Sequence, residues 1–459
     1  MIFSNLPNTP KRALIQLISS KDSRTALAQK NIVLSFGLKG ISIIISFLLV
    51  PLTINYLNVT DYGIWLTLSS ILTWINFFDI GLANGLRNKL TEVLAHQDLK
   101  LARKYVSTTF ALLTVIIGVF FALFIITNLF LHWDQILNTP IEERQKLNNL
   151  VIIVFAFFCL QFVFKTVGII LVSAQKPAIN DLLNIIANLI SLVVIYTLTK
   201  TTTASLNYVA CTFAGAPFMV FLFAYVALFW GKYSYLRPSF LSIDLQYTKS
   251  LIGLGLKFFI IQIAVCIVIY TSTNILLTQL FGSKSVTIYN IAFKYFNAIS
   301  MAYMIIIMPF WSAATDAYVK QDFEWIQKSL QKLIAMFGLS LMVTAIMIIF
   351  SNKFYRFWVG SAIEIPFSLS VLVAIYITLF NWSNTFIYFI NGIGKIQLQL
   401  LITIIIAILY IPMAIFLGHI WQINGVVLAS IISLLPTSIL MPIQCKKIYS
   451  ANATGIWNK

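Results

Sequence analysis

Twelve long apolar segments run through almost the whole chain. They lie near residues 32–54, 62–84, 106–130, 149–173, 182–199, 207–230, 251–280, 286–311, 333–350, 366–391, 396–418 and 421–443. A helix needs about 20 apolar residues to cross the hydrocarbon layer of a bilayer. Backbone amides in lipid must find partners within the chain, and continuous apolar runs favour helices over the alternating strands of a barrel. The sequence therefore predicts an all-α integral membrane protein with about twelve transmembrane helices.

The two halves of the chain show an internal repeat. Lys39 and Lys257 each end a Gly-Leu-Lys tripeptide near the start of an apolar segment, 218 residues apart. Three further pairs recur in the same order at offsets of 217 to 219 residues, namely Lys176 with Lys395, Asn207 with Asn424, and Pro217 with Pro436. Such repeats are typical of transporters, and an even number of spans per half makes both halves enter from the same side. We therefore expect two six-helix lobes related by a parallel repeat.

The repeat and the loops divide the chain into five predicted parts. They are an N-terminal cytoplasmic or interfacial segment (1–31), a first lobe (32–230), a cytoplasmic linker (231–249), a second lobe (250–444) and a cytoplasmic tail (445–459). The linker carries several charged residues and has no long apolar run. Rocking of the lobes about this linker would open a central cavity to each side of the membrane in turn.

Basic residues predict the orientation of the chain. Of its 31 Lys and Arg residues, 21 fall in segments that are internal if the N-terminus is cytoplasmic, and six fall in outer loops. Cytoplasmic loops of membrane proteins carry such an excess. We therefore expect a multi-pass protein of the bacterial inner membrane with both termini in the cytoplasm. The formal net charge of +17 then reflects topology and attraction to anionic membrane lipids, and does not point to nucleic acid.

Charged residues inside the predicted spans are the strongest candidates for a site. Charged residues of any position make up only 10% of the whole chain, against about 25% in an average soluble domain. Lys294 lies about 13 Å from the outer end of its span at 1.5 Å per residue, and Asn290 and Asn297 share its helical face. A charge at mid-bilayer costs about 2.5–3.5 kcal/mol on insertion scales, so it normally faces a cavity or a partner. We expect these three residues to bind substrate, with hydrogen bonding between helices as the alternative for the asparagines.

Other ionisable residues extend this candidate site. Lys39, Lys165 and Lys257 lie near the cytoplasmic ends of their spans, where snorkelling to the surface is the alternative to binding substrate. Asp79 could couple transport to a proton or sodium ion, or form an ion pair with Lys39 or Arg87. Four lysines against one clear acid predict a positively charged cavity and an anionic cargo.

The chain lacks the signatures of an enzyme or an ATP-driven pump. Its stretches at 282–285 and 392–395 lack the full GxxxxGK[ST] spacing and a preceding strand. Its three histidines and four cysteines show no metal-ligand spacing. No predicted external loop is large enough for a convergent acid, base or metal site. We therefore expect a transporter without a cofactor or a metal.

Three stretches of the first two predicted helices carry a recognisable pattern, namely 46–52 (SFLLVPL), 61–65 (DYGIW) and 78–87 (FDIGLANGLR). They closely resemble the first two helices of Wzx-type polysaccharide flippases, which belong to the superfamily that includes the MATE antiporters. The resemblance extends over the full length in helix number, repeat and topology. It implies a flippase that moves an undecaprenyl-pyrophosphate-linked oligosaccharide, such as an O-antigen repeat unit, to the external leaflet. The cavity lysines would then meet pyrophosphate or acidic sugars, and polysaccharide polymerase machinery would be a partner.

Three alternatives stay open at this point. A MATE-type drug or cation antiporter should favour acidic residues in its cavity, whereas this chain places lysines there. A lipid II flippase also carries an anionic polyprenyl pyrophosphate, but normally has more than twelve helices. A membrane glycan polymerase would need a large external loop. The sequence names neither the glycan nor the coupling ion.

The charge asymmetry generates a first testable prediction about topology. A reporter that is active only in the cytoplasm should work when fused after Lys459, and one that is active only in the periplasm should work when inserted at 134–146. The opposite pattern at either position would contradict the predicted orientation.

Overall fold

Every regular element in the described part of the chain is a helix. The computed structural model describes residues 23–72, 82–174, 176–248, 272–361, 363–450 and 452–458. The α-helices are α2 (Ser23–Leu57), α3 (Val59–Leu72), α4 (Leu82–Ala95), α5 (Leu99–Asn128), α6 (Trp133–Leu137), α7 (Arg144–Phe164), α8 (Thr166–Ser173), α9 (Pro177–Thr201), α10 (Leu206–Phe229), α13 (Ser272–Phe281), α14 (Ser283–Val319), α15 (Phe323–Val359), α16 (Phe367–Ile393) and α17 (Gln397–Tyr449). Short 3-10 turns are η2 (Ile141–Glu143), η3 (Ser234–Leu236), η4 (Phe240–Ser242), η5 (Leu245–Tyr247) and η7 (Gly455–Asn458). The predicted all-α class is confirmed.

Nine stretches of helix within the described residues are long and apolar enough to cross a membrane. One of them, α17, is a hairpin of two arms. Its backbone leaves the helical conformation at Trp421 and Gln422. A Cβ on Gly425 would lie 1.9 Å from the carbonyl oxygen of Leu417, although a straight helix would hold these residues about 12 Å apart. The two arms match the predicted spans 396–418 and 421–443. The predicted spans 62–84 and 251–280 lie partly outside the described residues, and the number twelve stays a prediction.

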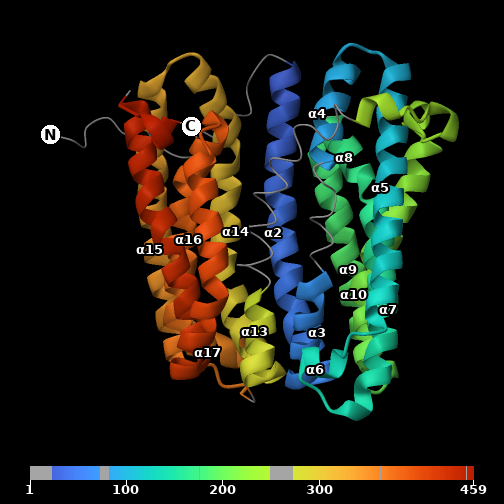
Figure 1. Cartoon of the computed structure of the whole chain (residues 1–459), viewed down its shortest axis with the longest axis vertical. Helices are drawn as coiled ribbons and strands as arrows, with labels where there is room; N and C mark the ends of the chain where they lie inside the picture. Colours follow the sequence, from blue (N-terminus) through green and yellow to red (C-terminus); the bar gives the residue numbers. More distant parts are fainter. Residues whose placement is uncertain are drawn as a thin grey trace.

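The helices gather in two groups. Figure 1 shows α2 to α10 on one side of the molecule and α13 to α17 on the other. We call them the first group (23–248) and the second group (272–458). Within the first group, Ile45 and Leu49 of α2 pack against Ile185 and Ile195 of α9. The described part of α2 includes Ser23, inside the predicted N-terminal segment, and no proline or glycine interrupts residues 23–31 before the predicted first span.

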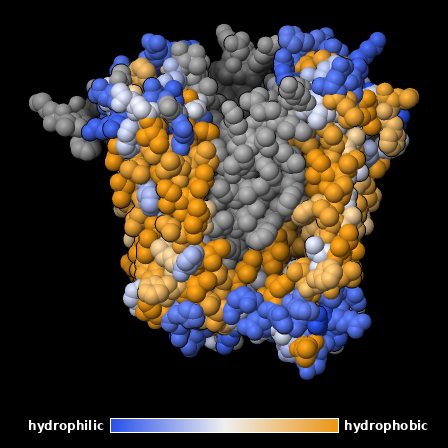
Figure 2. All heavy atoms as spheres, viewed as in Figure 1, coloured by the Kyte–Doolittle hydropathy of each residue, from blue (hydrophilic) through white to orange (hydrophobic). Residues whose placement is uncertain are grey.

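An apolar belt surrounds the molecule between two polar ends. α2 begins and α17 ends at the same end, which we call the terminal end (Figure 1). The other is the opposite end. Figure 2 shows hydrophilic residues gathered at both ends and hydrophobic residues between them. Large apolar side chains such as Val115, Phe223 and Ile349 are exposed in this belt. Because soluble proteins rarely expose so large a continuous apolar surface, the belt supports a membrane-spanning fold.

One of the repeated lysine pairs occupies equivalent positions in the two groups. Lys176 lies between α8 and α9, and Lys395 lies between α16 and α17. In both turns the lysine backbone N–H donates to a carbonyl five residues earlier, that of Leu171 at 2.8 Å and that of Ile390 at 3.3 Å. Each half therefore has a lysine in the same kind of turn between two helices.

The described part of the predicted linker, which we call the connector (231–248), is attached to α5. Lys104 Nζ lies 3.0 Å from Asp244 Oδ2, and the hydrogen bond from Lys104 holds the pKa of the Asp244 carboxyl below its usual value. The backbone N–H of Ser239 donates to Ser107 Oγ at 3.1 Å, and that of Asp244 donates to Thr108 Oγ1 at 3.0 Å. The connector therefore belongs structurally to the first group, and we expect movement between the groups to leave it in place.

This attachment predicts where the chain can be cut. Splitting it after Thr248 and co-expressing the two parts should retain assembly and some transport, because the connector stays with its partners on α5. Splitting near Lys176 divides a packed group and should be much more damaging. Fragment levels in the membrane and glycan export would be measured for both. Equal loss of export, with all fragments present in the membrane, would count against two separate groups.

Candidate functional site

Lys294 joins the two groups. It lies on α14, about 16 Å along the axis from Ser283 at 1.5 Å per residue, and is half-buried. Its Nζ donates a hydrogen bond to the hydroxyl of Tyr62 at 3.0 Å and lies 5.7 Å from the centre of the Tyr62 ring. Tyr62 belongs to α3 in the first group. The predicted site lysine is therefore held at the contact between groups by a neutral partner.

Polar side chains continue this contact between α3, α13 and α14, which we call the seam. Thr67 Oγ1 and Thr278 Oγ1 are 2.6 Å apart, and both residues are fully buried. Asn274 Nδ2 donates to Ser70 Oγ at 2.7 Å, and Asn290 Nδ2 donates to Asn274 Oδ1 at 2.9 Å. Buried polar groups in an apolar medium need such partners. The seam is thus specified by hydrogen bonds as well as by apolar packing.

The seam is tightest near the opposite end. A Cβ on Gly63 would lie 1.9 Å from the carbonyl oxygen of Ser283, so only glycine lets α3 approach α14 this closely. The loop helix α6 covers the same place. Asn138 Nδ2 donates to the Thr278 carbonyl at 3.2 Å, and Gln279 Nε2 donates to the Gln135 carbonyl at 2.7 Å. The described contacts between the groups therefore close the molecule at its opposite end, where α3, α6 and α13 lie together (Figure 1).

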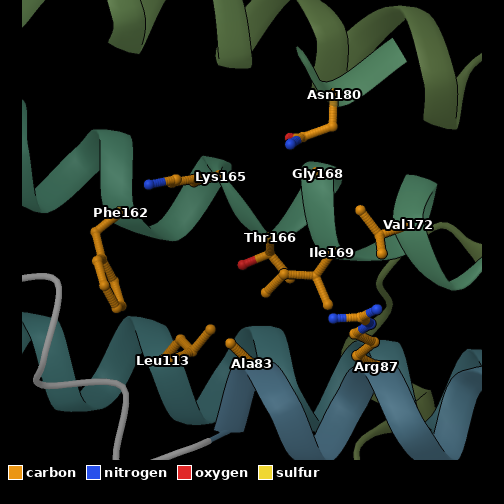
Figure 3. A pocket seen from close by; sticks show the side chains of 10 residues that line it. All are labelled: Ala83, Arg87, Leu113, Phe162, Lys165, Thr166, Gly168, Ile169, Val172 and Asn180. Carbon is orange, nitrogen blue, oxygen red and sulfur yellow. The ribbon is translucent and has the colours of Figure 1, made fainter. Parts of the chain in front are cut away.

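A second cluster of cationic side chains lines a cavity formed by helices of the first group. Arg87 of α4 and Lys165, at the junction of α7 and α8, line a cavity of about 300 Å³ together with Thr166 and Asn180. Figure 3 shows the two cations rising from different helices on two sides of the cavity. A Cβ on Gly168 would lie 2.1 Å from Asn180 Oδ1, so glycine makes room for that amide. A guanidinium, an ammonium, a hydroxyl and an amide together suit an oxyanion.

The structure places four of the sequence candidates, two in the seam and two, Arg87 and Lys165, in the cavity of the first group. Asn290 and Lys294 lie in the seam, and the amide of Asn290 also donates to the Val286 carbonyl at 2.9 Å. Asn297 follows them on α14 and is half-buried. Lys39 is half-buried near the start of the span Gly37–Leu57. Two further candidates, Lys257 and Asp79, lie outside the described residues.

Sequence reasoning missed the first-group side of the seam. The residues on this side lie in or next to the DYGIW stretch, namely Tyr62, Gly63 and Thr67. That stretch carries the resemblance to a known family, but no residue in it is a predicted site residue. Their partners on α13 and α14 stand more than 200 residues away in the chain. The signal available was a small residue and hydroxyls in an otherwise apolar helix, which is typical of close helix packing in membranes.

Comparisons with known proteins agree with this architecture. Residues 28–314 match the sequence pattern of the family described as "Polysaccharide biosynthesis protein". A putative O-antigen export protein of Yersinia pseudotuberculosis is 23% identical over 381 residues, which cover 79% of this chain and 83% of that protein.

Solved structures of MATE transporters show the same fold. An inward-facing MATE transporter of the MOP superfamily superposes with a TM-score of 0.65 at 15% identity, covering 87% of this chain and 96% of that one. An outward-facing MATE structure gives the same TM-score and identity, covering 94% and 97%. The expectation of a transporter rather than an enzyme is confirmed by these comparisons. The chain belongs to the polysaccharide biosynthesis protein family and has the fold of the MATE transporters of the MOP superfamily.

Proposed function

We propose that the protein flips an undecaprenyl-pyrophosphate-linked oligosaccharide across the bacterial inner membrane, from the cytoplasmic to the external leaflet. In this proposal the terminal end is cytoplasmic, and the two groups rock so that a cavity between them opens to each side in turn. The polyprenyl tail would stay in lipid while the sugars cross a wet path, because sugar hydroxyls are costly to bury without hydrogen bonds. Delivery to a polysaccharide polymerase is the expected next step.

The observation that carries the proposal is the position of Lys294 in the seam. Among the described residues, no carboxylate lies within ion-pairing distance of its Nζ, and its hydrogen-bond partner is the neutral Tyr62. A cation in an apolar setting is expensive unless it meets an opposite charge. Separation of α3 from α14 would break the bond to Tyr62 and free the ammonium for an anion. Pyrophosphate or an acidic sugar supplies that charge.

The cavity with Arg87 and Lys165 supports the same choice of cargo. Arg87 lies about 12 Å from the end of α4 at 1.5 Å per residue, on the side where the proposed cytoplasmic surface lies. Arginine binds phosphate oxygens through two parallel hydrogen bonds, and lysine adds a point charge. We assign this cavity to the first capture of the pyrophosphate, and Lys294 to a later step nearer the opposite end. The Yersinia pseudotuberculosis relative, a putative O-antigen export protein, supports a glycan cargo.

A MATE-type drug or cation antiporter is the second candidate, and the likeness of the fold favours it. A cationic drug would be repelled by Lys294, Arg87 and Lys165, whereas a lipid-linked pyrophosphate would be attracted. Drug susceptibility and surface glycan, measured in the same deletion strain, separate the two functions.

Replacing Lys294 with Ala should reduce glycan export by about tenfold or more. A hydrogen bond to a charged group contributes about 1.5–3 kcal/mol, and every 1.4 kcal/mol is about tenfold in affinity. Lys294→Arg should restore part of the export, because it keeps the charge in a different geometry. Export would be measured as surface glycan at matched protein levels in the membrane.

Lys284→Ala is the matched control, because Lys284 is exposed at the start of the same helix. It should export normally. Normal export by a stably inserted Lys294→Ala protein would remove Lys294 from the cargo path.

Replacing Gly63 with Ala should prevent closure at the opposite end. The added Cβ meets the Ser283 carbonyl, a backbone atom that cannot rotate away. We expect loss of export together with faster reaction of a Thr278→Cys reporter with a water-soluble maleimide. Gly118→Ala on α5 is the control, because nothing lies within 4 Å of its Cβ position. Equal export and equal labelling in the two variants would contradict a functional seam.

A further inference from the structure

The connector presents two adjacent apolar side chains that touch almost nothing. Phe240 is 93% exposed and Leu241 is 99% exposed, both in the turn η4. Leu245, a few residues later, is also exposed. Single exposed apolar residues are common on proteins, but neighbouring ones on a fixed turn indicate a contact surface.

The turn is held firmly on both sides. Ser239, just before it, donates its backbone N–H to Ser107 Oγ, and Asp244, just after it, exchanges hydrogen bonds with Thr108 Oγ1. Asp244 also pairs with Lys104. Figure 1 shows the connector extending sideways from the first group near α5. The position of the two apolar side chains along α5 is therefore defined.

That position matches the edge of the hydrocarbon layer. α5 has 30 residues, which corresponds to about 45 Å, whereas the hydrocarbon layer is about 30 Å thick. Its far end is apolar and exposed as far as Leu129 and Phe130, so the excess of about 15 Å falls at the terminal end. Ser107 and Thr108 lie about 12–14 Å from the start of α5 at 1.5 Å per residue. The turn that they hold therefore sits where headgroups meet acyl chains.

The charges around the turn fit an anionic lipid surface. Lys100, Lys232 and Arg237 are exposed at the same end of the first group. Arg237 also lies over the ring of Trp230 at 5.5 Å, and that ring is itself exposed. Two nearby acidic side chains already have partners within the protein. Asp98 accepts a hydrogen bond from the backbone at the start of α5, and Asp244 forms an ion pair with Lys104. Basic clusters beside apolar and aromatic side chains are typical of proteins that hold anionic headgroups.

We propose that the Phe240–Leu241 turn is a membrane foot, which inserts into the headgroup region of the anionic leaflet at the terminal end. The foot would fix the connector and the first group to that leaflet during transport. Its occupant is the lipid surface, and the inference does not depend on which cargo is carried.

A spin label attached at Leu241→Cys tests the foot directly. The variant would be made with Ala at the four native cysteines, reconstituted in vesicles containing phosphatidylglycerol, and compared with labels at Gln246→Cys and Val115→Cys. Gln246 is an exposed polar residue of the same connector, and Val115 faces the apolar belt. We expect the ratio of oxygen to water-soluble nickel accessibility at Leu241 to exceed that at Gln246 several-fold and to approach that at Val115.

A water-like ratio at Leu241, equal to that at Gln246, would overturn the proposal and leave the turn as a surface for another protein. Vesicles of phosphatidylcholine alone should give a shallower label, and an unchanged depth would overturn the role of the cations. If the cysteine-free protein does not insert, maleimide labelling of Leu241→Cys in the native background gives the same decision. Peptide mass spectrometry would locate the label, and slow labelling relative to Gln246→Cys is the expected result.

Discussion

The close approach of α3 to α14 is the contact on which the arrangement of the two groups depends. Gly63 lets the backbones meet, and the hydroxyls and amides around it then fall within hydrogen-bonding distance across the seam. Thr67 and Ser70 also donate to carbonyls of their own helix. In lipid no water is present to satisfy their remaining hydrogen-bonding capacity, so the bonds across the seam do so. The seam is consequently a strong contact when closed. It also releases many polar groups together when opened, which suits a contact that changes during transport.

The role proposed for Lys294 depends on this contact. Lys294 is tolerated because Tyr62 offers both a hydroxyl and a ring face. Neither neutralises its charge, so an anionic cargo would be a better partner than the one it has. Asn290, one turn away, uses its amide within the seam and links α14 to α13. One face of α14 thus combines a structural residue with the proposed binding residue.

Much of the fold could be predicted from the sequence, because lipid imposes a strict rule on composition. Continuous apolar runs specified the helices, and the isolated charge of Lys294 singled out a residue that the structure places at the contact between groups. The partner Tyr62 could not be predicted, because a tyrosine in an apolar segment is equally compatible with ordinary packing. Pairings such as Thr67 with Thr278 depend on how the groups dock, which local periodicity does not encode. The sequence predicts the connector only as a linker between lobes. Its attachment to α5 depends on the hydroxyls of Ser107 and Thr108, and nothing in the sequence distinguishes these from other helical hydroxyls.

The most direct test locks the seam while transport is measured. Thr67 Oγ1 and Thr278 Oγ1 are 2.6 Å apart, so cysteines at both positions would bring sulfurs close to the bonded distance of about 2.05 Å. The double variant would be reconstituted with a polyprenyl-pyrophosphate oligosaccharide, and the sugar reaching the other leaflet would be counted with a lectin. The account predicts flipping by the reduced double variant, arrest on oxidation and recovery on reduction, whereas oxidation should leave flipping by each single variant unchanged. Undiminished flipping by the fully oxidised protein, or no flipping by the reduced one, would contradict it.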